Sequence, residues 1–219
     1  MPRKNLIRTN TFAYHIYARS NNREWFFIPQ QEVWEICSTY FQTISDRYQA
    51  HLHSFVLMNN HFHMIISTPQ SNIDSIMNYW MREVSRNIAK SANRINHIFG
   101  GRYKWCLIQS ESYYSHVYRY VYRNPIEAGL TQSTAGYPFS TFHYLYHKLP
   151  LAFPIYDADY VDKNISIPKE LNSRLIWLNQ AYSEQENELL KRGLRRSIFH
   201  LSKKNTFIST RKRLIHSPK

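Results

Sequence analysis

Two histidines separated by one residue, His61 and His63, have a spacing that suits a metal ion. They begin a run of β-forming residues that extends to Ser67. Residues two apart on a strand project from the same face, so both imidazoles can reach one ion while Phe62 enters the opposite side. The same spacing is common among histidines that only pack, and 11 histidines are spread over this chain. The pattern therefore permits chelation without deciding it.

A tyrosine that could act as a nucleophile falls within a later helical pattern. His116, Tyr120 and Asn124 are spaced by four and share one stripe, beside an apolar stripe that includes Val117 and Val121. With 17 tyrosines in the chain, a half-buried aromatic with a hydrogen-bonded hydroxyl is the ordinary reading of any one of them. A phenol with a reference pKa of about 10 needs activation to attack, and a nearby divalent ion can supply it. The two patterns therefore make chemical sense as one site.

The elements that would position these residues alternate between strands and helices. The expected elements are a strand at Thr11 to Arg19, a helix at Pro29 to Tyr48, a hairpin of His51 to Met58 and His61 to Ser67, a helix at Asn72 to Phe99, a strand at Arg102 to Gln109 and a helix from Ser112 to about Arg123. Pro125 should end or kink the last helix, because proline disfavours helical backbone at the preceding residue. This order predicts an α+β, ferredoxin-like (βαββαβ) core with one added helix, a fold that implies no function by itself.

The C-terminal third predicts two more helices. One is expected around Pro168 to Ala181, and Ser183 and Glu186 form a capping-box pattern that starts a second helix running to about Phe199. Residues 131–165 are expected to be an irregular connector. The predicted organisation is therefore a catalytic domain at 1–130, a connector at 131–165, and a helical region with a basic tail at 166–219.

The charge favours a polyanionic partner, because the net charge is +13. Residues 191–219 contain 10 Lys and Arg and no Asp or Glu, so much of the excess is a tail that could attract DNA or simply be solvated. The long predicted helix carries a basic stripe, which could likewise contact DNA phosphates or simply be solvated; it consists of Arg82, Arg86, Lys90 and Arg94.

Cysteine content and hydropathy narrow the class of protein. Cys37 and Cys106 fit neither a disulfide framework nor a zinc ribbon, and we expect both to be reduced core thiols. No long apolar run and no secretory signal are present, which favours a cytoplasmic protein without a membrane segment.

Two segments resemble the motifs of the single-tyrosine HUH transposases. Ser54 to Ile66 (SFVLMNNHFHMII) is similar to the family's "VLMPNHxHLLL" hairpin, with Asn59 in place of the usual proline. Tyr120 to Leu130 (YVYRNPIEAGL) resembles the "YxxxNPVxAGL" segment. The Asn-Pro pair within it, together with Trp177 to Phe199, is similar to the branch of REP-associated tyrosine transposases, although the stretch Ser197 to His200 departs from that pattern. The resemblance extends over most of the chain.

The resemblance implies a site and a reaction. Tyr120 would be the nucleophile, in preference to Tyr113, Tyr114, Tyr118 or Tyr122, and His61, His63 and Asn124 would hold Mg²⁺ or Mn²⁺. Attack on DNA would leave a 5′-phosphotyrosine and a free 3′-OH, and another 3′-OH could reverse the step and join strands. The implied partners are single-stranded DNA and DNA hairpins such as REP-like repeats, bound by a monomer or homodimer.

Two alternatives use the same basic charge without chemistry. One is a ferredoxin-like protein that binds single-stranded or hairpin nucleic acid independently of metal. The other treats the two C-terminal helices as a helix-turn-helix that reads duplex DNA, although the turn at Tyr182 to Ser183 is short and lacks glycine.

Overall fold

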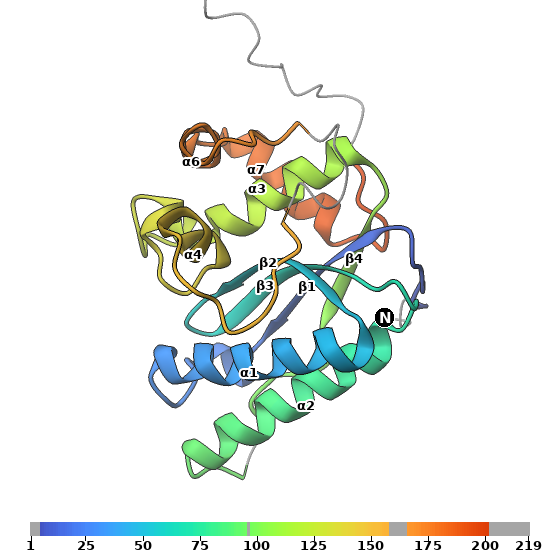
Figure 1. Ribbon diagram of the computed structural model, residues 1–219, viewed down its shortest axis with the longest axis vertical. Helices are drawn as coiled ribbons and strands as arrows, with labels where there is room; N and C mark the ends of the chain where they lie inside the picture. Colours follow the sequence, from blue (N-terminus) through green and yellow to red (C-terminus); the bar gives the residue numbers. More distant parts are fainter. Residues whose placement is uncertain (1–4, 96, 158–165, 202–219) are drawn as a thin grey trace, which may run out of the picture.

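Four antiparallel strands form one sheet at the centre of the molecule (Figure 1). The computed structural model describes residues 5–95, 97–157 and 166–201. The strands β1 (Ala13–Arg19), β2 (His51–Leu57), β3 (His61–Ser67) and β4 (Lys104–Ile108) lie in the order β2-β3-β1-β4. This order, with a helix between β1 and β2 and another between β3 and β4, confirms the predicted ferredoxin-like core.

Helices cover both faces of the sheet. On one face lie α1 (Gln30–Tyr48) and α2 (Ile73–Ser91), as Figure 1 shows. The other face carries the helices that follow β4 in the chain, namely α3 (Glu111–Glu127), α4 (Thr141–His147), α6 (Leu171–Asn179) and α7 (Glu184–Leu194). The sheet is therefore a middle layer, and most side chains on its two faces are shielded from water.

Alternation along β1 divides its side chains between two cores. Tyr14 and Ile16 belong to the apolar cluster beneath α1 and α2. Ala13 belongs to the second cluster, beneath α3, together with Ile65 of β3. Because side chains alternate along a strand, the odd-numbered residues of β1 and β3 face α3. The face under α1 and α2 is apolar, whereas the face under α3 also accommodates polar groups.

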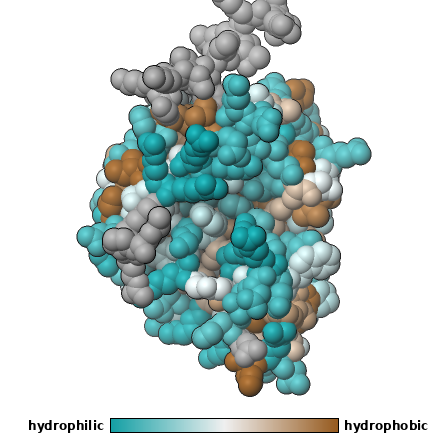
Figure 2. Space-filling view, turned by 180° about the vertical axis from the view of Figure 1, so that it is seen from behind, coloured by the Kyte–Doolittle hydropathy of each residue, from teal (hydrophilic) through white to brown (hydrophobic). Residues whose placement is uncertain are grey.

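The surface carries no broad apolar face in the view of Figure 2, where hydrophilic residues dominate and apolar ones are scattered. No helix within the described ranges is long and apolar enough to cross a membrane. Cys37 and Cys106 are both buried and free, as expected of core thiols.

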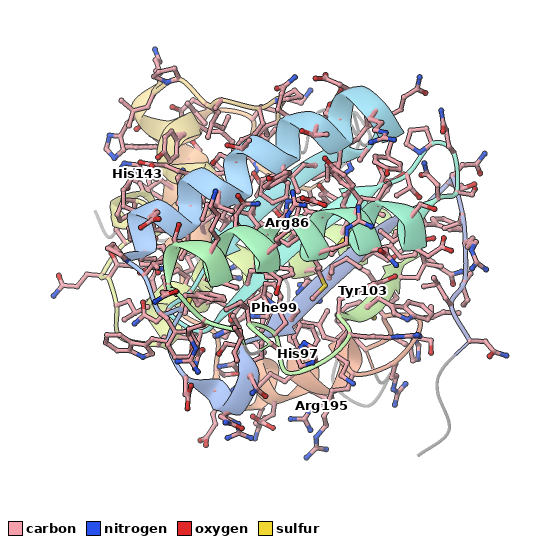
Figure 3. The ribbon with its side chains drawn as sticks, turned by 90° about the horizontal axis from the view of Figure 1, so that it is seen from below. Arg86, His97, Phe99, Tyr103, His143 and Arg195 are labelled. Atoms are coloured by element: carbon pink, nitrogen blue, oxygen red, sulfur yellow. The ribbon has the colours of Figure 1, made fainter. Side chains whose placement is uncertain are left out.

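Helix α2 is shorter than its apolar pattern predicts. It ends at Ser91, because Asn93 takes a left-handed backbone with φ of 49° and the Arg94 N–H turns back to the Ala89 carbonyl at 2.8 Å. Asparagine tolerates that conformation better than most residues. The segment beyond the helix, which includes the labelled His97 and Phe99 in Figure 3, is not helical. The expectation of a helix to Phe99 was wrong.

Helix α3 is longer than predicted and passes through Pro125 to Glu127. Proline has no N–H to donate to the carbonyl four residues earlier, which here belongs to Val121. The Asn124 side chain takes over that role, because its Nδ2 donates to the Val121 carbonyl at 3.3 Å and to the Tyr120 carbonyl at 2.8 Å. Gly129, with φ of 70°, follows the end of the helix.

The C-terminal region packs back onto the core. The expected irregular segment contains η2 (Thr134–Gly136) and α4, and its residues 158–165 lie outside the described part. The capping box at Ser183 and Glu186 is confirmed, but α7 ends at Leu194 and not near Phe199. Beyond it the chain pairs with β4, where Phe199 N–H donates to the Leu107 carbonyl at 2.8 Å. The predicted division into three segments stays a prediction.

Gly193 provides a test of this C-terminal packing. A Cβ at this position would lie 2.8 Å from Cε2 of Phe199 and 3.2 Å from the His200 carbonyl oxygen. We expect Gly193→Ala to lower the free energy of unfolding by about 1–2 kcal/mol, because overpacking outweighs the better helix propensity of alanine. Urea unfolding measures the change, with the exposed neighbour Arg192→Ala as control. Equal stability of both variants would contradict the close packing of Phe199 on α7.

Candidate functional site

His61 and His63 project from β3 toward α3, as their spacing predicts. Their ring centroids are 5.1 Å apart with an interplanar angle of 83°. His63 is 5% exposed, whereas His61 is half-buried at the end of the strand. Phe62 points to the opposite face and joins the apolar cluster under α1 and α2. The strand therefore presents two imidazoles on one face, one of them open to solvent.

Each imidazole is held through its Nδ1 atom. His61 Nδ1 lies 2.8 Å from Asn60 Oδ1, and since an amide oxygen only accepts, the imidazole donates and its Nε2 keeps a lone pair. His63 Nδ1 lies 3.0 Å from Nε2 of His15. Histidines that bind metals commonly use one ring nitrogen for the ion and the other for such a contact. The arrangement leaves Nε2 of both rings as the nitrogen for a ligand.

His15 is a site residue that the sequence reasoning missed. It is 1% exposed, stacks on His63 with centroids 5.2 Å apart, and has its Nδ1 buried without a hydrogen-bond partner among the described residues. The strand predicted at Thr11 to Arg19 rested on the alternating apolar residues Phe12, Tyr14, Ile16 and Ala18 alone. The intervening residues His15, Tyr17 and Arg19 occupy the other face, and this second alternation is the signal that would have found them.

Tyr120 of α3 lies directly over the stacked rings of His15 and His63. Its ring is 5.7 Å from that of His63 and 6.0 Å from that of His15, nearly perpendicular to both. Asn124, one turn later, fixes its amide Nδ2 on its own helix. Its Oδ1 has no hydrogen bond within the described residues, which leaves it able to accept or to ligate. The structure thus brings Tyr120 against the two-histidine strand, with Asn124 on the same helical stripe.

Burial controls the protonation of these groups. Desolvation lowers the pKa of His61 to about 4 and that of His15 to about 3, and it lowers the pKa of His63 well below the ordinary value. The same effect raises the pKa of Tyr120 to about 12, while the positive charges of Arg19 and Arg195 oppose the rise. At neutral pH the imidazoles are neutral, as metal ligands must be, and the phenol is protonated.

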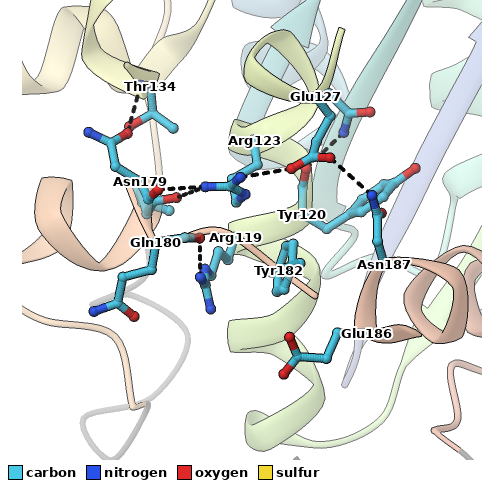
Figure 4. Close-up of polar contacts among 12 residues, drawn as sticks. Arg119, Tyr120, Arg123, Glu127, Thr134, Asn179, Gln180, Tyr182, Glu186 and Asn187 are labelled. Carbon is cyan, nitrogen blue, oxygen red and sulfur yellow. Dashed lines mark hydrogen bonds and ion pairs between the residues drawn. The ribbon is translucent and has the colours of Figure 1, made fainter. Parts of the chain in front are cut away.

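A buried polar network fixes α3 against the C-terminal helices (Figure 4). Arg123, 3% exposed, donates to the carbonyls of Leu178 and Asn179 and pairs with Glu127 at 2.7 Å. Glu127 also accepts from Asn187 of α7 at 3.0 Å. These contacts flank the turn of α3 that carries Tyr120, so the C-terminal helices help to set its position.

Arg119 adds a cation–π contact to the same junction. Its guanidinium lies 4.3 Å from the centroid of the Tyr182 ring and donates to the Gln180 carbonyl (Figure 4). Tyr182 lies just before α7, so the short turn between α6 and α7 is clamped by α3. His116, on the stripe of Tyr120, is half-buried there and is not brought into ring contact with His61 or His63.

Several predicted basic residues lie away from the site. Arg86, labelled on α2 in Figure 3, and Arg82 both pair with Glu83, on the opposite face of the sheet from Tyr120. Arg94, by contrast, lies beyond the end of α2 and over the Phe27 ring. Lys203, Lys204 and Arg211 to Arg213 of the predicted tail lie outside the described residues. The described ranges contain no group of three or more His, Cys, Asp or Glu suited to a metal ion, and an amide such as that of Asn124 is outside those residue types.

Known proteins similar to this chain point in one direction. A REP-associated tyrosine transposase of Escherichia coli (strain K12) is 27% identical over 92 residues, 42% of this chain and 54% of that protein, so the match spans about half of that relative. The solved structure of a REP-associated tyrosine transposase bound to a REP hairpin superimposes with a TM-score of 0.56 at 18% identity, covering 75% of this chain and 96% of that one. It confirms the fold.

The family follows from a longer match. Residues 8–124, more than half of the chain, match the IS200-like transposase family. The match includes both histidines of β3, the β1 residues beside them, Tyr120 and Asn124. The resemblance predicted from the hairpin and Asn-Pro motifs is confirmed, and the chain belongs to the IS200-like transposase family.

Proposed function

We propose that this protein cuts and rejoins single-stranded DNA at hairpins through a covalent bond to Tyr120. The observation that carries the proposal is the edge-on packing of Tyr120 against His63, with ring centroids 5.7 Å apart, inside the family-matched segment. A nucleophile beside a pair of neutral, oriented imidazoles that could hold a metal ion is an arrangement that can carry out phosphodiester transfer.

The proposed reaction exchanges one phosphodiester bond for another. The Tyr120 phenol oxygen attacks phosphorus, the bond from phosphorus to the 3′ oxygen breaks, the phenol proton leaves to solvent and the 3′ oxygen ends as a hydroxyl. The product is a 5′-phosphotyrosine. A second 3′-OH then displaces the tyrosine by the reverse exchange, so joining needs no ATP.

His61, His63 and Asn124 are proposed to hold Mg²⁺ or Mn²⁺. Two neutral imidazoles and one amide oxygen fit such an ion modestly, because Mg²⁺ prefers oxygen ligands, so DNA oxygens and water would complete the shell. When bound, the ion supplies Lewis-acid stabilisation of the charge on the scissile phosphate. Asn60 and His15 orient the two imidazoles, and Asn124 is oriented by its own helix backbone.

A DNA hairpin is the proposed substrate. The relative that shares this fold was solved with a REP hairpin, and the net charge of +13 suits a polyanion. We propose that a monomer or homodimer binds such a hairpin together with its unpaired flank. The alternative, a related protein that binds the same DNA without cutting it, predicts metal-independent binding and no covalent product.

Replacing the nucleophile tests the chemistry. We expect Tyr120→Phe to abolish the covalent adduct with a hairpin that carries single-stranded flanks, because the ring remains but the attacking oxygen is gone. Denaturing gels with labelled DNA and Mn²⁺ measure the adduct. Tyr113→Phe is the matched control on the same helix and should keep it. An adduct that persists in Tyr120→Phe would remove the proposed role of this residue.

Replacing Asn60 tests the orientation of His61. We expect Asn60→Ala to weaken Mn²⁺ binding about 10–100-fold, the usual effect of losing a hydrogen bond to a metal-binding histidine. Asn60→Asp keeps an oxygen acceptor and should bind at least as tightly. Calorimetric titration of the DNA-bound protein measures both, and the exposed Asn5→Ala serves as control. Equal Mn²⁺ affinity in all three variants would argue against a metal on His61.

The pH dependence should follow Tyr120. Its pKa is raised to about 12 by burial, so the reactive phenolate is scarce at neutral pH and its fraction grows as pH rises. We therefore expect the single-turnover rate of adduct formation to increase from pH 6.5 to 9. The imidazole of His61, with a pKa near 4, stays neutral throughout that range. A rate that falls over the same interval would contradict an attacking phenolate.

A further inference from the structure

We propose that a basic edge beside His61 binds the unpaired DNA strand that flanks the cleaved phosphate. This basic edge consists of Arg19, Arg23, Trp25, Arg94 and Arg102. The arginines would contact phosphates and Trp25 would stack on one base, the combination by which proteins hold single strands. The inference rests on the proposed function for the identity of its ligand and extends it to residues outside the catalytic set.

Backbone hydrogen bonds join two distant segments into this edge. Ser20 N–H donates to the Asn60 carbonyl at 2.8 Å, which ties the end of β1 to the turn before His61. Asn21 N–H donates to the Ile98 carbonyl at 2.8 Å, and Gly100 N–H donates to the Arg19 carbonyl at 3.0 Å. The residues around 19–27 and those leading from α2 to β4 therefore form one surface at the His61 end of the sheet.

The loop that carries Trp25 is anchored on both sides. Phe26 is 7% exposed, packs against Phe99 and donates its N–H to the Asn59 carbonyl at 3.0 Å. Asn60 Nδ2 donates to the Arg23 carbonyl at 2.7 Å. Trp25 nevertheless remains 71% exposed. A large aromatic side chain that is exposed on an anchored loop is available to stack on a flat ligand.

Two residues of this loop have a left-handed backbone, which indicates that surrounding contacts fix its conformation. Asn22 has φ of 54° and Arg23 has φ of 62°. A non-glycine residue in that region is unfavourable and persists where surrounding contacts hold it, commonly at binding sites. Here the hydrogen bond from Asn60 to Arg23 is such a contact, and the same Asn60 side chain accepts a hydrogen bond from His61. The loop and the candidate metal ligand are thus held by one amide group.

The charge of the edge is not neutralised. Within the described residues, none of its four arginines forms an ion pair, in contrast to Arg82 and Arg86, which share Glu83. Arg19, Arg23 and Arg102 are exposed, and Arg94 lies 3.4 Å from the centroid of the Phe27 ring. Glu24 is the single carboxylate in the sequence from Arg19 to Phe27. Guanidinium groups without a carboxylate partner suit phosphate.

The edge is continuous with the catalytic face. Arg19 pairs with His61 in the register of β1 and β3, so its side chain leaves the sheet on the side of Tyr120. Its positive charge is close enough to lower the pKa of His61 and to oppose the rise in the pKa of Tyr120. A phosphate placed between Tyr120 and His61 would therefore lie beside Arg19, and the loop that carries Trp25 is tied to the turn before His61 by Asn59 and Asn60.

The chemistry of the edge favours a single strand over a protein. Among the neighbouring residues that the structure describes, Ile95 is the one other large exposed apolar residue, and arginines interrupt the surface around it. Protein interfaces have an apolar centre, which this edge lacks. A duplex hides the faces of its bases within the stack, whereas unpaired bases can stack on Trp25.

The test compares two DNA hairpins with the same stem, one blunt and one carrying a single-stranded flank of 12 nucleotides. Fluorescence anisotropy of the full-length protein measures binding. We expect Trp25→Ala to weaken binding of the flanked hairpin about 10–100-fold, the loss typical of one stacked base, and to leave the blunt hairpin unchanged. Trp25→Phe should recover most of the affinity. Trp25 is exposed, and thermal unfolding confirms that each variant is folded.

Salt dependence tests the arginines separately. We expect Arg23→Gln and Arg102→Gln each to reduce the slope of log affinity against log salt concentration by about 0.7, the value for one phosphate contact on a single strand. Arg47→Gln, at an exposed position on α1, is the matched loss of charge and should leave the slope for the flank unchanged. Equal losses for Arg23→Gln and Arg47→Gln would overturn the edge as a specific site.

The outcomes separate this inference from the proposed function. Unchanged binding of the flanked hairpin by Trp25→Ala, with a Tyr120 adduct still formed, would overturn the edge and leave the function standing. If Trp25→Ala loses binding to the flank and the unaltered protein forms no adduct on any hairpin, the edge would be upheld and the non-catalytic alternative would be favoured.

Discussion

Neutral imidazoles buried between the sheet and α3 are the constraint around which this site is organised. A charged group would be costly there, and burial lowers the pKa values of His15 and His63. Buried ring nitrogens favour partners close by, which explains the contacts from His61 to Asn60 and from His63 to His15. The same burial that keeps these rings uncharged also keeps the Tyr120 oxygen protonated.

The position of Tyr120 depends on residues far from it in the sequence. Val117 and Val121 pack one side of α3 into the core over the sheet. Arg123 and Glu127 bind the other side to α6 and α7. A side chain whose position must be fixed to within a few tenths of an ångström benefits from support on both sides. The two C-terminal helices supply that support.

The sequence predicted most of the framework, because periodicity reflects burial directly. The strands, the His61–His63 hairpin and the capping box at Ser183 follow from local patterns. The exceptions arose where tertiary contacts or side-chain substitution overrode the local rule. Asn93 ends α2 although an apolar pattern continues to Ile95, which is fully exposed. The alternation of His15 with Tyr17 and Arg19 could have placed His15 on the polar face of the first strand, but its contact with His63 depends on the pairing of two strands, which one sequence does not display.

The side chain of Asn124 has a consequence for ligand binding. Its amide nitrogen already bonds the carbonyl that Pro125 leaves without a partner, so the side chain has lost its rotational freedom before any ligand arrives. A flexible amide would have to give up that entropy on coordination. The proline therefore does more than shape the helix, because the hydrogen bond that replaces its own fixes the side chain of Asn124, the proposed metal ligand.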